Sequence, residues 1–317
     1  MNAFYEDVKH GLINEPKKLH SKYFYDKTGD LIFQKLMHSP EYYLSKCELE
    51  ILKNQSTEIT NSFIKDFNEF DLIELGAGDA SKSIFLLRAL LENKDVDFTY
   101  CPIDISSNII NKLEKKLPQM LPDLKIKGLN GEYLTMLQEH AEHSNKPKVI
   151  LFLGANIGNM HYSDAIVFCE KLHDHLNKGD LLFIGFDLKK NPYTILAAYN
   201  DKAGLTKKFN LNLLKRINNE LEGNFNVNTF SHYPCYDPAT GECKSYLISQ
   251  VNQDVVFGKN GDKTTIHFQE NEAIFMEISK KYSLDEIRNL ADSAEFKATN
   301  HFLDSKKWFV DSLWKKE

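Results

Sequence analysis

The central part of the chain alternates between two hydrophobic patterns. Between residues 70 and 187, short uninterrupted apolar runs alternate with longer segments in which apolar residues recur every three or four positions. The short runs are typical of buried strands, and the longer segments of amphipathic helices. This alternation predicts a parallel sheet with helices on both faces. The predicted strands are 70–75, 98–103, 123–128, 148–153 and 181–187, and the predicted helices are 81–93, 106–117, 133–142 and 163–176.

The first 66 residues carry a helical pattern. Apolar residues fall at helical spacing in a stretch that begins at Phe4 and in another that begins at Leu31. Ser45 and Glu48 have the spacing of a capping box, in which a hydroxyl and a carboxylate accept hydrogen bonds from each other's backbone N–H groups at a helix start. These two residues therefore predict one long helix that continues to Phe63.

The pattern changes again after residue 190. Two more helices are predicted, followed by several extended segments joined by turn sequences, which we expect to form an antiparallel meander. A last helix and two strands close the chain. The helices are 193–203, 211–222 and 283–294; the extended segments are 225–235, 243–251, 254–258, 264–269 and 273–278, with turns at 237–241 and 259–262; the closing strands are 296–303 and 307–314.

Composition and charge disfavour several classes of protein. The 317 residues carry a formal net charge of -6, which gives no general attraction for nucleic acid or anionic lipid. We find no apolar run long enough to span a bilayer and no signal-peptide core near Met1. Five widely spaced cysteines indicate reduced thiols and a cytoplasmic location. The pairs His140/His143 and His173/His175 are interpreted as surface residues, and no metal site is predicted.

The strongest signal of function follows the first predicted strand. The apolar run there ends at Leu75, and Gly76-Ala77-Gly78-Asp79 leads into the next predicted helix. Glycine lacks a Cβ and lets the backbone pass close beside a ligand, while the helix start offers free N–H groups. This arrangement is typical of a turn that binds a nucleotide or nucleoside.

Asp104 narrows the class of ligand. It ends the second predicted strand, where a carboxylate can accept hydrogen bonds from both ribose hydroxyls. Dinucleotide-binding turns have a third glycine and an acid about 20 residues further on. Here Ala80 and Ser81 follow the turn, and the acid is further away. The sequence therefore favours a nucleoside with a short zwitterionic tail, such as S-adenosylmethionine.

This ligand suggests a fold and a division into domains. Methyltransferases that use S-adenosylmethionine complete their seven-stranded sheet with a terminal helix and strand hairpin, as predicted at the end of this chain. We expect an α/β fold: a Rossmann-like class I methyltransferase parallel sheet with a terminal antiparallel hairpin, plus an α+β substrate-binding domain. The S-adenosylmethionine-binding domain would be 46–189 and 279–317, and the substrate-binding domain 1–45 and 190–278.

The loop after the fourth predicted strand contains two glycines and two asparagines. Ligands of open parallel sheets bind beyond the carboxyl ends of the strands. Asn156 and Asn159 offer both donors and acceptors, and Gly154 and Gly158 allow them to approach a small polar ligand. We interpret Asn159 as the stronger candidate. The alternative is a tight loop in which the asparagines only bond nearby backbone groups.

Several segments together match the pattern of one family. They are Tyr23-Phe24-Tyr25-Asp26 with Gly29 and Phe33, Pro40-Glu41-Tyr42-Tyr43 through Glu48, Glu74-Leu75-Gly76-Ala77-Gly78, Phe152-Leu153-Gly154 with Ile157-Gly158-Asn159, Ala198-Tyr199-Asn200-Asp201 with Ala203-Gly204, Phe209-Asn210, Asn218 with Glu220 and Leu221, and Glu277-Ile278-Ser279-Lys280. In these segments the chain resembles the L-histidine Nα-methyltransferase family of ergothioneine biosynthesis. The resemblance runs from about residue 10 to the end.

The resemblance implies a set of cofactor-binding residues. Asp104 would hold the ribose of S-adenosylmethionine, and Lys82 its methionyl carboxylate. Glu132, where the family is expected to have aspartate, would contact the adenine side. The full cofactor-binding set is Tyr42, Gly76, Lys82, Asp104, Glu132, Tyr133 and Gly154.

The resemblance also implies residues for the amino acid. Glu277 and Ser279 would bond the two imidazole nitrogens of histidine, because residues i and i+2 of a strand share one face. Tyr25 is the predicted catalytic residue, near the reacting amine. The predicted substrate-binding set is Phe33, Asn159, Tyr199, Phe209, Ser245, Glu277 and Ser279, with Asn159 and Tyr199 at the carboxylate and amine end.

Two departures from the family pattern concern this pocket. Ser245 stands where methionine is expected, and Asn156 replaces a smaller hydroxyl residue. Both changes make the predicted pocket more polar. They leave open an acceptor other than histidine.

The resulting hypothesis is an enzyme that moves methyl groups from S-adenosylmethionine to the α-amine of L-histidine, up to the trimethylated betaine. Its partner would be a small amino acid, with no nucleic acid, membrane or obligate protein partner. One alternative is the same chemistry on another amino acid or small amine. A nucleotide-dependent oxidoreductase is disfavoured by the missing third glycine. A non-catalytic binding module and a nucleic-acid methyltransferase are further alternatives, and the negative charge disfavours the latter.

Overall fold

The computed structural model describes residues 3–65, 67–259 and 261–317. Residues 1, 2 and 66 of the N-terminal helical stretch, and residue 260 of the predicted turn at 259–262, lie outside this description. The chain divides into two compact units. Unit 1 comprises Met1–Tyr43 and Lys190–Ser279, and unit 2 comprises Leu44–Lys189 and Lys280–Glu317.

Unit 2 contains a mostly parallel sheet. Among the described residues its strand order is β12-β13-β6-β5-β1-β2-β3, and β4 also pairs with β2. Strands β1 to β6 of this sheet pair in parallel, whereas β13 is antiparallel to both β6 and β12. The predicted α/β sheet with a terminal antiparallel hairpin is confirmed. The strands are β1 (Glu69–Leu75), β2 (Asp97–Asp104), β3 (Lys125–Ile126), β4 (Leu129–Asn130), β5 (Lys148–Phe152), β6 (Leu181–Asp187), β12 (Phe296–Leu303) and β13 (Phe309–Lys316).

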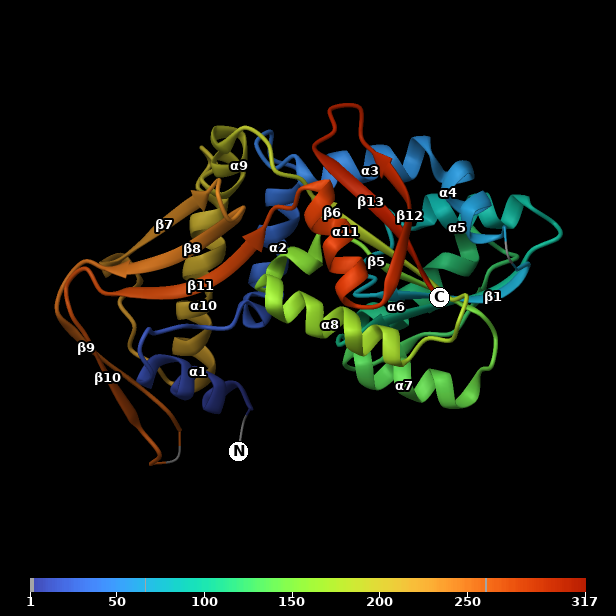
Figure 1. Cartoon of the computed structure of the whole chain (residues 1–317). Helices are drawn as coiled ribbons and strands as arrows, with labels where there is room; N and C mark the ends of the chain where they lie inside the picture. The colour runs from blue at the N-terminus through green and yellow to red at the C-terminus, as the bar shows by residue number, and fades with distance from the viewer. Residues whose placement is uncertain (1–2, 66, 260) are drawn as a thin grey trace. The chain divides into compact units, whose positions relative to one another are not determined.

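Helices cover both faces of this sheet, so its central strands β5 and β6 are buried at every residue and are almost entirely apolar. Helices α7, α8 and α11 pack on one face, and α3, α4 and α5 on the other (Figure 1). Helix α6 packs against β2, β3 and β4. The bounds are α3 (Leu44–Asn54), α4 (Ser56–Phe63), α5 (Ile84–Glu92), α6 (Ser107–Met120), α7 (Tyr133–His143), η2 (Asn156–Asn159), α8 (Tyr162–Asp174) and α11 (Leu284–Ser293).

Unit 1 combines helices with two small sheets. The helices α2, α9 and α10 pack with the sheet β11-β8-β7, and β9 and β10 form a separate hairpin. Its core is aromatic and aliphatic and includes side chains of α1, α10 and all the strands β7 to β11. The elements are α1 (Ala3–Ile13), η1 (Ser21–Phe24), α2 (Lys27–Met37), α9 (Pro192–Tyr199), α10 (Leu205–Leu221), η3 (Val227–Thr229), β7 (Phe230–Asp237), β8 (Glu242–Ser249), β9 (Gln253–Phe257), β10 (Thr264–Phe268) and β11 (Ala273–Lys280).

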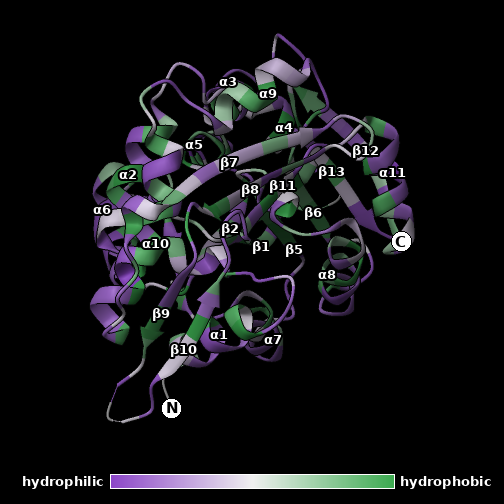
Figure 2. Cartoon of the chain, turned by 90° about the vertical axis from the view of Figure 1, so that its left-hand side faces the viewer, coloured by the Kyte–Doolittle hydropathy of each residue, from purple (hydrophilic) through white to green (hydrophobic). Residues whose placement is uncertain are grey.

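The outer helices are amphipathic, as their sequence spacing predicts. Figure 2 shows hydrophilic and hydrophobic residues alternating along α2, α6 and α8. In α8, for example, Ala165, Cys169 and Leu172 are buried at a spacing of three or four residues. No helix in the described ranges is both long enough and apolar enough to cross a membrane.

The predicted antiparallel meander is wrong, because the strands of unit 1 divide between two sheets. Strand β11 pairs with β8 and bypasses the β9–β10 hairpin. Residues near the N-terminus also bond to β11: Leu19 N–H donates to the Phe275 carbonyl, and Phe275 N–H donates to the Lys17 carbonyl, at 2.9 Å each. A contact so distant in sequence is not visible in the local hydrophobic pattern.

The predicted long helix with a Ser45/Glu48 capping box is also wrong. Helix α3 begins at Leu44, so Ser45 lies inside it, and the helical run is divided in two at Gln55. The side-chain amide of Gln55 donates to the Leu303 carbonyl at 2.8 Å. Glu48 is fully buried and bonds to other parts of unit 2, as described below.

Several further element boundaries differ from the prediction. The predicted helix 193–203 ends at Tyr199, and the predicted extended segment 225–235 contains the short helix η3 before β7 begins at Phe230. The segment 123–128 forms two short strands, β3 and β4, because Gly128 N–H donates to the Glu114 side chain at 2.8 Å and leaves the ladder. Helix α10 begins at Leu205 instead of 211. The Asp201 carboxylate accepts hydrogen bonds from the N–H groups of Leu205 and Thr206, at 2.7 and 2.8 Å, and so caps the first turn of the helix. This turn is largely polar, so the hydrophobic pattern did not predict it.

Candidate active site

The carboxyl end of β1 in unit 2 turns sharply at Gly76. This residue has a φ of +73°, and a Cβ added to it would lie 2.6 Å from the hydroxyl oxygen of Tyr133. Glycine is therefore required here both by backbone conformation and by space. Gly78 has a φ of +54° but no atom within 4 Å of an added Cβ, so the turn has open space beside it.

Asp104 lies at the end of the neighbouring strand β2. Its Oδ1 accepts the Ser106 N–H at 2.8 Å, and the residue is only 9% exposed. Burial raises the pKa of its carboxyl group, and hydrogen bonds from the backbone of Ser106 and Gly78 oppose that shift. Asp104 and the open turn at Gly78 therefore belong to the same edge of the sheet. A ribose could bind there, with its hydroxyls on the Asp104 carboxylate and the backbone of the turn close beside it.

Glu132 and Tyr133 begin helix α7. Glu132 occupies the N-cap position with an exposed side chain that does not cap the helix. Burial raises the pKa of Tyr133 to about 12, so its hydroxyl stays protonated. The contact of Tyr133 with the Gly76 turn brings together two residues that the sequence predicted for one site.

Lys82 forms an ion pair that the sequence did not predict. Its Nζ donates to Glu48 Oε2, and Glu48 Oε1 accepts the Gly154 N–H. Glu48 therefore connects two predicted cofactor residues, one after β1 and one after β5. A signal for it does exist in the sequence, because Glu48 falls at the helical spacing of the buried face of α3, with Leu44, Ile51 and Leu52. A carboxylate on such a face must have a buried partner.

The polar loop after β5 forms the short helix η2. Asn156 Nδ2 donates to the Leu153 carbonyl at 2.8 Å, so this side chain stabilises the loop itself. Asn159 is the last residue of η2 and is exposed. Gly158 is packed tightly, since an added Cβ would lie 2.7 Å from the Lys280 carbonyl oxygen.

Unit 1 gathers the predicted aromatic residues. The ring centroids of Tyr25, Phe33 and Phe209 are 5.5 Å apart in each pair, and Tyr42 lies 6.2 Å from Phe33. We call these four residues the aromatic cluster. Tyr25 is 48% exposed, whereas Phe209 is buried. Tyr25 is thus the most exposed residue of the aromatic cluster.

The predicted polar residues of unit 1 form two pairs. Tyr199, which ends α9, donates from its hydroxyl to Ser279 Oγ at 2.6 Å, and both residues are buried. Asn210 Nδ2 lies 3.4 Å from Glu277 Oε1 and also donates to the Thr206 carbonyl. Asn210 was part of the family resemblance but not of the predicted site. Its Oδ1 is buried, with no hydrogen-bond partner in the described part of the chain.

Ser245 is buried on β8 and lies 3.3 Å from the Nε2 of His232 on β7. Burial lowers the pKa of His232 to about 4, so this histidine is neutral near pH 7. The hydroxyl that replaces the expected methionine is therefore paired within unit 1. The Asn156 side chain likewise bonds within its own loop, so both residues that depart from the family pattern have hydrogen-bond partners inside their own units.

The interpretation of His140 as a surface residue is wrong. It is 4% exposed, and its Nε2 lies 2.9 Å from Asp71 Oδ2, which also accepts from the Ser144 hydroxyl. Among the described residues, Asp71, Cys101 and His140 are the group whose ligand atoms are close enough to share a metal ion. Burial raises the pKa of the Cys101 thiol to about 12, and the hydrogen bonds already pair the Asp71 carboxylate. Hydrogen bonds to His140 and Ser144 account for the buried Asp71 carboxylate, whereas His140 Nδ1 is buried with no hydrogen-bond partner among the described residues.

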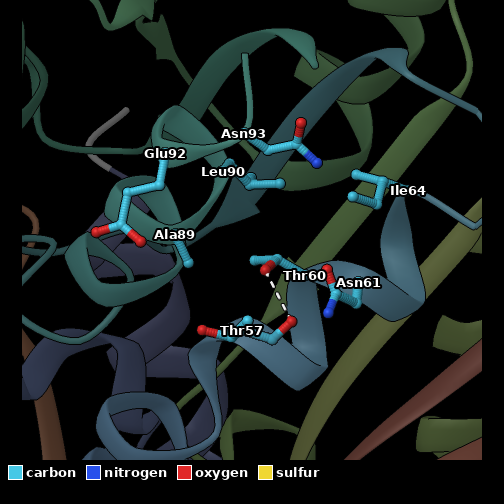
Figure 3. A pocket seen from close by; sticks show the side chains of 8 residues that line it. All are labelled: Thr57, Thr60, Asn61, Ile64, Ala89, Leu90, Glu92 and Asn93. Atoms are coloured by element: carbon cyan, nitrogen blue, oxygen red, sulfur yellow. Dashed lines mark hydrogen bonds between the residues drawn. The ribbon is translucent and has the colours of Figure 1, made fainter. Parts of the chain in front are cut away.

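A pocket of about 190 Å³ lies between α4 and α5 (Figure 3). Thr60 and Asn61 come from α4, and Ala89 and Glu92 from α5. Within α4, which forms one side of the pocket, the Thr60 hydroxyl donates to the Thr57 carbonyl at 3.2 Å. Since its lining contains none of the predicted site residues, this pocket has no part in the candidate site.

The predicted residues divide between the units in an unexpected way. Tyr42, predicted for the cofactor, belongs to unit 1, and Asn159, predicted for the amino acid, belongs to unit 2. Every other predicted cofactor residue lies in unit 2 and every other substrate residue in unit 1. The carboxyl edge of the unit 2 sheet offers glycine turns, an acid and a cation, which fit a nucleoside with a charged tail.

Comparison with known proteins identifies the family. A family model described as histidine-specific, SAM-dependent methyltransferase matches residues 4–316. A protein of Mycobacterium tuberculosis (strain CDC 1551 / Oshkosh), named histidine N-alpha-methyltransferase, is 30% identical over 309 residues, which are 98% of this chain and 91% of that protein. A protein of Schizosaccharomyces pombe, named ergothioneine biosynthesis protein 1, is 29% identical over 291 residues, which are 90% of this chain and 37% of that protein.

Solved structures show a more distant likeness. Magnesium protoporphyrin IX methyltransferase from Synechocystis PCC 6803 is 12% identical, with a TM-score of 0.47 over 94% of this chain and 98% of that one. The match of the family model to almost the whole chain confirms the expected family and its cofactor. The chain therefore belongs to the family of histidine-specific methyltransferases that depend on S-adenosylmethionine, and it is an amino-acid N-methyltransferase.

Proposed function

We propose that this chain methylates the α-amine of L-histidine and repeats the transfer until the trimethylated betaine is formed. The names of its relatives and the family description support the substrate. The single observation that carries the proposal is the polar face of β11. Glu277 and Ser279 stand at i and i+2 on one strand, one held by Asn210 and the other by Tyr199.

This face suits an imidazole ring. A carboxylate can accept one ring N–H, and a hydroxyl can donate to or accept from the other nitrogen. The Ser279 oxygen accepts from Tyr199, and in this proposal the serine hydroxyl donates its own hydrogen to a ring nitrogen. The aromatic cluster would pack against the flat apolar side of the amino acid. An indole would offer a partner to only one of these two polar groups, and an aliphatic side chain to neither, which would cost binding energy.

In the proposed cofactor half, Asp104 holds the ribose hydroxyls and Lys82 the methionyl carboxylate. S-adenosylmethionine supplies a methyl group on a positively charged sulfur, so little further activation is needed. The contribution of the chain is to align the amine and to keep it unprotonated. We assign a contact that aids proton loss to Tyr25, the exposed residue of the aromatic cluster. Its hydroxyl oxygen would accept a hydrogen bond from the amine, while the departing proton passes to water.

The polarity of Ser245 and Asn156 had left another amino acid open as the acceptor. Their internal hydrogen bonds with His232 and Leu153 now favour histidine. We also propose that the enzyme works in the cytoplasm, since all five cysteines are free thiols and four of them are buried.

The test is a competition among the common amino acids. The purified full-length chain is incubated with isotope-labelled S-adenosylmethionine and an equimolar mixture of amino acids, and products are identified by mass spectrometry. We expect label in histidine, with mono-, di- and trimethylated forms appearing in sequence. Nα,Nα-dimethylhistidine should also be accepted, and imidazolepropionate, which lacks the amine, should not. Faster labelling of another amino acid would overturn the assignment of the substrate.

A further inference from the structure

A cluster of ionisable groups is buried on the face of the unit 2 sheet that α3 covers. It contains three carboxyl groups, Glu48 on α3, Glu74 on β1 and Asp311 on β13, and one cation, Lys82. Glu48 and Asp311 are 0% exposed and Glu74 is 4% exposed. Ionised carboxylates are costly to bury without partners, so three buried acids around one lysine require a physical explanation.

The carboxyl groups of Glu48 and Asp311 converge above one glycine. Asp311 pairs with Gly185 in the β13–β6 ladder. A Cβ added to Gly185 would lie 2.5 Å from Glu48 Oε1 and 3.0 Å from Asp311 Oδ1. Glycine is therefore the residue that leaves room for both side chains at this place in β6.

The hydrogen bonds of the cluster favour different protonation states for its acids. Glu48 accepts from the Lys82 ammonium and from the Gly154 N–H, which suits a carboxylate. Neither oxygen of Asp311 has a hydrogen-bond partner within the described residues. Burial raises the pKa of Asp311 well above its usual value; the negative charge of Glu48 raises it further, and Lys82 opposes the shift. Burial raises the pKa of Glu74 to about 7, although the Tyr100 hydroxyl donates to it.

We propose that Glu48 and Asp311 are positioning residues of the cofactor half-site. Ionised Glu48 holds the Lys82 ammonium and the Gly154 N–H in a fixed relation, and protonated Asp311 keeps a second negative charge away from them. Neither group is accessible enough to touch a ligand, so both act through Lys82 and Gly154. The inference rests on the proposed role of Lys82 as the partner of the methionyl carboxylate.

The charge balance of the cluster determines whether Lys82 can bind the carboxylate of the donor. Glu48 and Lys82 together are neutral, and Lys82 can still bond the carboxylate of a zwitterion that carries its own ammonium. Ionised Asp311 would leave the pair with an excess negative charge, which repels that carboxylate and draws Lys82 inward. The charged groups that face Asp311 are Glu48 from α3 and Lys82 from the loop before α5, with Glu74 further along the same sheet face. Affinity for S-adenosylmethionine should therefore fall as the pH rises through the raised pKa of Asp311.

The test measures binding of S-adenosylmethionine and S-adenosylhomocysteine to the full chain by calorimetry. Glu48→Gln should weaken binding of the donor about tenfold or more, the range expected when a charge-assisted hydrogen bond is lost. It should raise the KM for the donor and leave the KM for histidine unchanged. Asp97→Asn, which breaks an exposed ion pair with Lys125 in the same unit, is the matched control and should leave donor affinity unchanged.

Two further comparisons show whether the effect passes through Lys82. In a cycle of Glu48→Gln, Lys82→Met and the double variant, the double variant should bind like Lys82→Met alone. Asp311→Asn should move the alkaline loss of affinity to higher pH than in the wild type, and this comparison also serves if Glu48→Gln does not fold. Two results would overturn the inference. One is that Glu48→Gln and Lys82→Met weaken donor binding additively in the double variant; the other is that donor affinity falls over the same alkaline pH range in Asp311→Asn as in the wild type. If the wild-type chain bound neither nucleoside, the cofactor half-site itself would be wrong, whereas unchanged binding by Glu48→Gln would refute only the inference.

Discussion

The Tyr199 hydroxyl donates a 2.6 Å hydrogen bond to Ser279 Oγ in the buried part of unit 1. This bond joins the end of α9 to β11, two elements that are 80 residues apart in the chain. It holds the Ser279 oxygen in place, so that the geometry of a substrate contact at Ser279 depends on Tyr199.

We expect Ser279→Ala and Tyr199→Phe each to raise the KM for histidine about fivefold to tenfold, the cost of one buried hydrogen bond. The double variant should lose less than the product of the two single effects, because both remove the same bond. Steady-state kinetics with saturating donor would show this. A raised KM for the donor instead would move the pair out of the amino-acid half-site.

Glu277→Gln should weaken histidine binding by about ten- to a hundredfold, since a charged acceptor for the ring N–H becomes neutral. Its amide can still face Asn210, so unit 1 should keep its fold. Calorimetry with histidine and with S-adenosylhomocysteine separates the two affinities. Glu270→Gln, an exposed position on the same unit, is the control. Equal losses for both ligands would contradict the assignment of Glu277 to the imidazole.

Tyr25→Phe should lower turnover about tenfold to a hundredfold, at or below the lower end of the range for a general acid or base, because its hydroxyl would only accept a hydrogen bond from the amine. The aromatic cluster keeps its ring, so affinity for both substrates should change little. Single-turnover measurements across pH would locate the effect in the chemical step. Tyr233→Phe, which changes another exposed tyrosine of unit 1, should have wild-type turnover. Wild-type turnover for Tyr25→Phe as well would remove this residue from the mechanism.

Gly76→Ala and Gly78→Ala form a matched pair in one turn. Both residues have positive φ, so alanine adds backbone strain of about 1 kcal/mol in each case. Only at Gly76 does the added Cβ also meet Tyr133, at 2.6 Å from its hydroxyl oxygen. Gly76→Ala should therefore displace Tyr133 and weaken donor binding more than Gly78→Ala does. Titrations with S-adenosylhomocysteine, together with thermal unfolding of both variants, would test this order.

Asp71 should make the stability of unit 2 depend on pH in the acidic range. Burial raises the pKa of Asp71, but the hydrogen bonds from His140 and Ser144 outweigh it, and the net pKa is lowered. A depressed pKa in the folded state contributes stability above the unfolded value, near 4, and that contribution is lost as the pH falls through the folded value. Denaturant unfolding should therefore show falling stability below about pH 4. In Asp71→Asn this part of the pH dependence should be absent; an unchanged slope would assign it to other carboxyls.

The central strands of the unit 2 sheet, β1, β2, β5 and β6, were predictable from the sequence, because they are mostly apolar runs and a helix follows each of them. The Gly76 turn and Asp104 could also be predicted, since each lies at the end of a strand that the sequence pattern indicates. Glu48 was misread because the spacing of Ser45 and Glu48 matches a local capping box, whereas the true partners of Glu48 are distant in the chain. His140 looked like a surface histidine among polar neighbours, and only the fold brings it to Asp71.

The place of β13 in the sheet has a consequence for synthesis. This strand lies between β6 and β12, yet residues 309–316 are synthesised after all the other described strands of this sheet. Until then one edge of β6 is unpaired, while the whole of unit 1 has already been made. From the synthesis of β6 until that of β13, the nascent chain therefore has a bare strand edge that can pair with other chains and promote aggregation.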